Sequence, residues 1–99
     1  MESVNGNVRG QGNFATFVCS AGESLPQTTF TWYKDGKLLS PSDRVSISTV
    51  ERQSTLTLKD LDVQNDGGHY TCRATNPVGF RETSVNLAVE SKWPLTFNP

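Results

Sequence analysis

Two cysteines and one histidine are the side chains of this sequence best suited to nucleophilic or acid–base chemistry: Cys19, Cys72 and His69. A catalytic cysteine needs a thiolate with a base beside it. Both cysteines lie in alternating stretches that are typical of β-strands, at positions that face a core. His69 falls on the outer face of its stretch, without a second histidine to complete a metal site or a triad. The sequence therefore predicts neither an enzyme nor a bound cofactor.

The acidic residues Asp60, Asp62 and Asp66 suggest a cation loop at first sight. Their spacing lacks the alternating acidic series and the terminal glutamate that complete a calcium site, so we expect a solvated turn and no metal. Nine basic against ten acidic residues give a net charge of -1. Such a balance offers no net field for nucleic acid or for an anionic membrane surface. No apolar run approaches the ~20 residues that a membrane span requires, so we expect no insertion by this segment.

The elements that would hold these residues are strands almost throughout, because polar and apolar residues alternate with period two. The 99 residues, 34% of them hydrophobic, suffice for one domain. Asp35-Gly36 predicts a tight hairpin, and the polar strand around Ile47 is expected near a sheet edge. The residues expected to face inward are Phe17, Cys19, Ala21, Phe30, Trp32, Leu56, Leu58, Tyr70, Cys72, Ala74, Val85, Leu87 and Val89. The pattern predicts an all-β domain of seven or eight strands.

Several motifs occur in a consistent order: Cys19, Trp32-Tyr33-Lys34-Asp35-Gly36, Leu56-Thr57-Leu58, Leu61, Asp66-x-Gly68-x-Tyr70-x-Cys72 and Ala74-Thr75-Asn76-Pro77-Val78-Gly79. With these motifs, residues 3–90 resemble the intermediate set (I-set) of immunoglobulin domains. The resemblance implies a two-sheet Greek-key sandwich with one inter-sheet disulfide, between Cys19 and Cys72. It also implies that Trp32, Tyr70 and Leu58 belong to the structural core.

Two further features are expected from the resemblance alone. Arg44, at the start of a strand, should form a structural salt bridge with Asp66 in the turn before the last cysteine. In the last hairpin, Asn76 should hydrogen-bond the backbone, and Gly79 should take a strained turn conformation.

Candidate protein-binding residues follow from the outer face of the same strands. Tyr33 and Arg73 alternate with core residues, and with Lys34 they are candidates for a basic and aromatic patch. Phe80 follows the last turn, where its ring is either tucked over the loop or shown to a partner. Aromatic and arginine side chains dominate the binding energy of interfaces, so Phe80, Tyr33 and Arg73 are the predicted contact residues.

The resemblance extends to modules of cell-adhesion molecules and receptor ectodomains. We therefore expect a protein-binding module of a multidomain, extracellular cell-surface protein that acts in adhesion or recognition. Its partner would be another protein, bound homophilically or heterophilically, and neighbouring domains would flank it in the parent chain. Oxidised cysteines would stabilise the fold by roughly 4 kcal/mol, which favours an oxidising compartment.

The alternative is a structural spacer or spring module of an intracellular sarcomeric or actin-associated protein, in which the cysteines would be reduced. Under either reading the sequence is expected to be a piece of a larger protein. Residues 91–99 contain two prolines, which interrupt ladder hydrogen bonding. We interpret them as a linker or as the start of a following domain.

Overall fold

The computed structural model of the chain describes residues 7–21 and 28–91. The predicted linker therefore lies, apart from Ser91, outside the described residues. The described ranges form eight strands, namely β1 (Asn7–Gly10), β2 (Ala15–Ser20), β3 (Thr29–Lys34), β4 (Lys37–Leu38), β5 (Val45–Val50), β6 (Gln53–Leu58), β7 (Gly68–Asn76) and β8 (Gly79–Glu90). Within those ranges, no helix is long and apolar enough to cross a bilayer.

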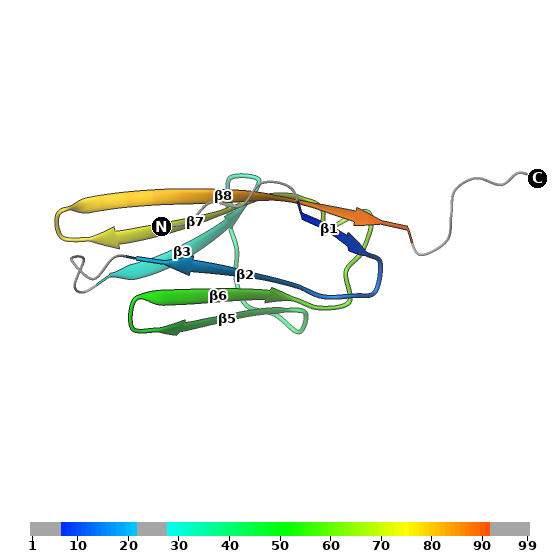
Figure 1. The fold of residues 1–99 in the computed structure, drawn as a ribbon, viewed down its shortest axis with the longest axis horizontal. Coiled ribbons are helices and arrows are strands. Elements are labelled where there is room, and N and C mark those ends of the chain that lie inside the picture. The colour runs from blue at the N-terminus through cyan, green and yellow to red at the C-terminus, as the bar shows by residue number, and fades with distance from the viewer. Residues whose placement is uncertain (1–6, 22–27, 92–99) are drawn as a thin grey trace, which may run out of the picture.

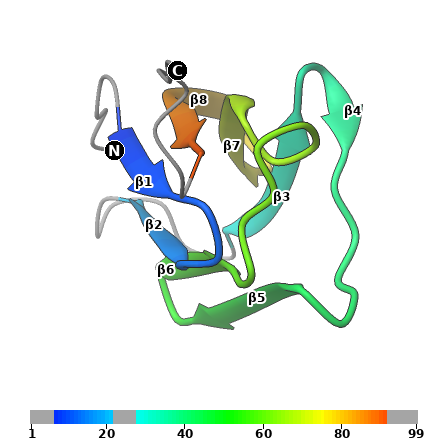
Figure 2. The same ribbon diagram turned by 90° about the vertical axis from the view of Figure 1, so that its right-hand side faces the viewer.

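The strands form two layers that face each other (Figures 1 and 2). One sheet has five strands in the order β1-β8-β7-β3-β4, and the other has three in the order β2-β6-β5. β1 runs parallel to β8, whereas the remaining neighbours are antiparallel. The prediction of an all-β, two-sheet sandwich is confirmed.

The turn at Asp35-Gly36 fixes how β4 returns beside β3. Both residues have positive φ, 51° at Asp35 and 84° at Gly36, as a two-residue hairpin turn with the right twist requires. The predicted hairpin is confirmed, and its register places Tyr33 opposite Leu38.

The core lies between the sheets and is crossed by the disulfide. Cys19 on β2 is bonded to Cys72 on β7, with their Cα atoms 6.4 Å apart, so the bridge joins the two sheets as expected. Trp32, Leu58 and Tyr70 are all buried. The other buried hydrophobic residues are Ala15, Phe17, Leu56, Leu61, Ala74, Val85 and Leu87.

The turn before β7 is held by Asp66, which is itself nearly buried. The Tyr70 hydroxyl donates to the Asp66 carbonyl oxygen at 2.5 Å, and burial raises the pKa of that phenol. The Asp66 carboxylate accepts two bonds from the Arg44 guanidinium, at 2.8 and 3.3 Å. It also accepts from the backbone N–H of Asp62 at 2.7 Å. The expected pairing of Arg44 with Asp66 is thus present, and it fixes the end of the sandwich from which β7 starts.

Candidate protein-binding surface

The three predicted contact residues lie on the outer face of the five-stranded sheet. Cys72 faces the core, so Arg73 on the same strand points outward. β7 pairs with β3 and β8 so that Arg73 stands opposite Thr31 and Glu82. Paired residues share a face of a sheet, and residues two apart on one strand do as well. This register brings Tyr33, Arg73 and Phe80 together from three adjacent strands.

The Arg73 guanidinium contacts both aromatic rings. Its central carbon lies 5.5 Å from the ring centroid of Tyr33 and 4.4 Å from that of Phe80. Its Nε donates to Glu82 Oε2 at 2.7 Å, and its Nη2 forms an ion pair with the same oxygen at 2.7 Å. Cation–π attraction and the charge-assisted bonds hold the planar group in one orientation. The result is an arginine that is fixed in place yet still 39% exposed.

Leu38, which was not among the predicted contact residues, extends this group to the edge strand. It lies opposite Tyr33 and is 65% exposed. Lys37-Leu38-Leu39 does not alternate, so period two gave no signal there. The predicted two-residue turn at Asp35-Gly36 carried the usable signal, because such a turn fixes which residues of the two strands pair. That pairing places Leu38 opposite Tyr33. We call Leu38, Tyr33, Arg73 and Phe80 the aromatic stripe.

Lys34 does not belong to the stripe, which corrects the expectation that it shares the face of Tyr33. Successive residues of a strand point to opposite faces. Its ammonium group accordingly lies 5.9 Å from the ring centroid of the core residue Tyr70 and 3.1 Å from Asp35 Oδ2.

The hairpin between β7 and β8 carries Phe80 on a short loop. Asn76 Oδ1 accepts hydrogen bonds from the backbone N–H groups of Val78 at 2.9 Å and Gly79 at 3.0 Å, as expected. The expected strain at Gly79 is wrong, because this glycine has no positive φ and pairs in register with Asn76. Phe80 is 59% exposed. Its ring therefore covers Arg73 on one side and stays open to a partner on the other.

Polar pairs continue the outer face away from the hairpin. Thr71 Oγ1 lies 3.0 Å from Ser84 Oγ, and His69 Nδ1 lies 2.7 Å from Asn86 Oδ1. His69 is thus exposed, as predicted, with an amide as its neighbour. The face combines an aromatic and cationic stripe with a hydroxyl and amide surround, the usual composition of a contact surface with a polar rim.

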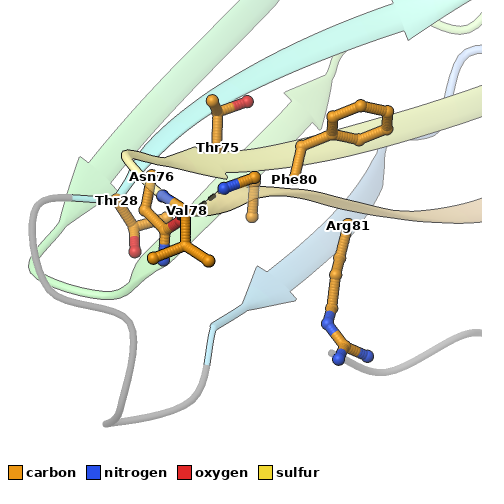
Figure 3. Close-up of a pocket in the computed structure, with 8 residues that line it drawn as sticks. Thr28, Thr75, Asn76, Val78, Phe80 and Arg81 are labelled. Carbon is orange, nitrogen blue, oxygen red and sulfur yellow. Dashed lines mark hydrogen bonds between the residues drawn. The ribbon is translucent and has the colours of Figure 1, made fainter.

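A shallow hollow of about 270 Å³ lies beside the hairpin between β7 and β8 (Figure 3). Its lining residues are Thr28, Ala74, Thr75, Asn76, Val78, Gly79, Phe80 and Arg81. The Arg81 side chain projects to the opposite side of β8 from Phe80. Across residues 7–21 and 28–91, no three histidine, cysteine or acidic side chains gather as a metal site would need. The residues named as lining the hollow include no cysteine, histidine or acidic side chain.

These features define the class of the molecule. Two packed sheets, an inter-sheet disulfide beside a buried tryptophan, and a tyrosine that bonds backbone two residues before the second cysteine are hallmarks of an immunoglobulin-like domain. The family model described as the immunoglobulin I-set domain matches residues 3–89. The chain belongs to this family.

Its relatives are long proteins. The chain is 40% identical over 79 residues to hemicentin-2 of Mus musculus, covering 80% of this chain and 2% of that protein. It is 33% identical over 86 residues to neural cell adhesion molecule 1 of Bos taurus, covering 87% of this chain and 10% of that protein. Among solved structures, the I-band fragment I67-I69 from titin has a TM-score of 0.79 and 32% identity, covering 86% of this chain and 29% of that one. The chain thus spans a small part of the proteins it matches.

Proposed function

We propose that this domain is a protein-binding module of a multidomain cell-surface protein, and that it acts in adhesion or recognition through the aromatic stripe. The observation that carries the proposal is Arg73 held between the rings of Tyr33 and Phe80 on an exposed sheet face. Arginine and tyrosine are enriched among the residues that dominate binding energy. Because the guanidinium is already held by Glu82, binding a partner would cost little further side-chain entropy at Arg73.

The relatives and the disulfide support the proposal that the domain belongs to an extracellular cell-surface protein. One relative is named for cell adhesion, and the match covers 10% of its length. A disulfide persists in oxidising surroundings, which favours an extracellular location. The family and the shallow surface favour a binding module over an enzyme. The partner is another protein, and flanking domains would present the stripe to it.

The test is binding of the oxidised chain as a streptavidin tetramer to a panel of cell lines, alongside aggregation of beads that carry the chain. The first assay reports heterophilic binding and the second homophilic binding, and tetramers raise weak affinity into the measurable range. Phe80→Ala should reduce binding at least tenfold, since hot-spot truncations cost over ~1.4 kcal/mol. Val78→Ala is the matched control, because Val78 lies in the same hairpin outside the stripe and is 93% exposed. Equal binding by both variants would contradict the proposal.

A spacer module of a sarcomeric protein is the second candidate function, supported by the similarity to the titin I-band fragment. A domain that works in a reducing compartment must fold without its disulfide. Reduction of a native disulfide in a small domain typically costs about 2–5 kcal/mol. We expect the reduced chain to lose its cooperative thermal transition near 37 °C. A reduced chain that stays folded there, with no binding in either assay, would favour the spacer.

A further inference from the structure

The strand β5 forms a border of the three-stranded sheet and lacks the usual protection of such a strand (Figure 2). Its sequence, Val-Ser-Ile-Ser-Thr-Val, contains no charge, no proline and no glycine. Natural edge strands are normally blunted by lysine, proline, bulges or short length. Uncharged, β-branched segments of this length are the ones most prone to pair with another strand.

The backbone register shows which groups this border leaves open. The Arg44 carbonyl accepts from the Lys59 N–H at 2.9 Å, so alternate residues beyond Arg44 also point their backbone toward β6. The groups of Val45 point the other way and exchange bonds with Ser42, at 2.9 and 3.3 Å. The N–H and C=O groups of Ile47 and Thr49 therefore point off the sheet. Among the described residues, no backbone group meets them there.

The side chains of β5 hold this strand firmly. Ile47 packs against the core, and Thr49 Oγ1 donates to the buried Ser54 Oγ at 3.0 Å. The outward side chains Ser46, Ser48 and Val50 are exposed. Their neighbours on the same face are also uncharged: Thr16, Val18, Ser20, Gln53, Thr55 and Thr57. An anchored strand with open backbone groups and a neutral face is already shaped to accept a further strand.

We propose that a second copy of this chain pairs with β5, antiparallel, about a two-fold axis at Ser48. In this register Ile47 of each copy lies opposite Thr49 of the other, and the two Ser48 residues lie opposite each other. All the open groups of both strands then pair, giving about four backbone hydrogen bonds. A register centred on Ile47 would leave Thr49 facing Val45, whose groups are taken by Ser42. Because β5 carries no charge, self-pairing places no like charges opposite each other within the strand.

The proposed strand pairing is a weak contact because it buries a small area. It also lies on a different sheet from the aromatic stripe. Pairing along one short strand buries far less than the ~1,200 Å² of a stable specific interface. Association is therefore expected at high concentration or when many copies are displayed on one surface. β5 belongs to the three-stranded sheet and the stripe to the other sheet. Failure of one proposal therefore leaves the other standing.

Sedimentation velocity of the full oxidised chain, from micromolar to millimolar concentration, tests the proposal. The wild-type coefficient should rise with concentration. Ser48→Lys places two ammonium groups opposite each other at the axis, so it should weaken association at least tenfold. Because Ser48 is exposed, the domain should stay folded. Thr16→Lys adds the same charge to the same sheet away from the border and should associate as wild type does. A monomeric wild type, or equal association by Ser48→Lys, would overturn the proposal.

Cysteine crosslinking tests the register independently. Residues opposite each other in a non-hydrogen-bonded antiparallel pair have Cα atoms about 4.5 Å apart, within disulfide range. Ser48→Cys should therefore form a covalent dimer on mild oxidation. Ser46→Cys should stay monomeric, because its two copies would lie more than ~10 Å apart along the strands. Dimers from Ser46→Cys, or none from Ser48→Cys, would contradict the two-fold axis at Ser48.

Discussion

The indole Nε1 of Trp32 donates a hydrogen bond to Ser54 Oγ at 2.9 Å across the interior of the sandwich. Ser54 is fully buried and also accepts from Thr49 Oγ1 at 3.0 Å. In the two sheets, Trp32 pairs with Cys72 and Ser54 with Cys19. The polar pair therefore lies beside the disulfide and satisfies the one donor of the tryptophan, which an apolar core would leave without a partner.

Ser54→Ala should lower the free energy of unfolding by about 1–3 kcal/mol, because the buried indole N–H would lose its acceptor. Denaturant unfolding measures the change. Ser20→Ala is the control, since Ser20 accepts a solvent-exposed bond from Gln53 at 3.3 Å, and it should change stability by no more than about 0.5 kcal/mol. Equal losses of unfolding free energy in the two variants would show that the buried bond from Trp32 to Ser54 stabilises the fold no more than the exposed bond from Gln53 to Ser20.

Asp66→Asn should also destabilise the fold, because the nearly buried carboxylate gives up its ion pair with Arg44 while the amide oxygen can still accept from Asp62. We expect a loss of about 1–3 kcal/mol in denaturant unfolding. Glu82→Gln serves as the control, since its ion pair with Arg73 is exposed on both sides and should contribute at most about 1 kcal/mol. A smaller effect for Asp66→Asn than for Glu82→Gln would contradict the structural role of this turn.

Gly68→Ala should lower the thermal stability of the domain more than Gly67→Ala does. Gly68 has a φ of 154°, and an added Cβ would lie 2.8 Å from Asp35 Oδ2. Backbone strain of this kind costs of order 1–3 kcal/mol before any clash is counted. Gly67→Ala meets only an ordinary contact, 3.4 Å from the Leu87 carbonyl oxygen. A thermal melt should show a lower midpoint for Gly68→Ala, and the reverse order would refute this reading of the turn.

Acid stability should depend in part on Asp35. The His69 backbone N–H, 3.0 Å from Asp35 Oδ1, and then the Lys34 ammonium hold the pKa of this carboxyl below its ordinary 3.8. A lowered pKa in the folded state adds stability above pH 3.8, which is lost as the pH falls through the folded-state pKa.

Asp35→Asn keeps an oxygen acceptor and tolerates the positive φ of this turn, so it removes the charge alone. Its free energy of unfolding should fall less than that of wild type between pH of about 6 and about 2.5. The exposure of Asp35 keeps the difference small. Parallel curves for the two proteins would show that this carboxyl does not contribute.

Period-two alternation was enough to predict the strands, most of the core and the shared face of Tyr33 and Arg73, because the direction of a side chain along a strand does not depend on the partner strand. The two-sheet arrangement came from the family resemblance. The contacts of the Arg73 side chain could not be predicted from alternation, because they depend on how neighbouring strands are paired. Its pairing with Glu82 depends on the register of β7 against β8. The bond from Trp32 to Ser54 depends on how the two sheets stack. Serine in a polar strand gives no hint of such a role, so these relationships emerge with the tertiary structure.

The aromatic stripe is tested most directly by comparing Arg73→Ala with Arg81→Ala in the tetramer-binding and bead-aggregation assays. Each variant removes one positive charge from the β7–β8 pair, but Arg81 projects to the opposite side from Phe80 (Figure 3). We predict that Arg73→Ala binds at least tenfold more weakly, as loss of a hot-spot arginine implies, and that Arg81→Ala binds as wild type does. Equal binding by the two variants, with both folded, would contradict the assignment of this face as the contact surface.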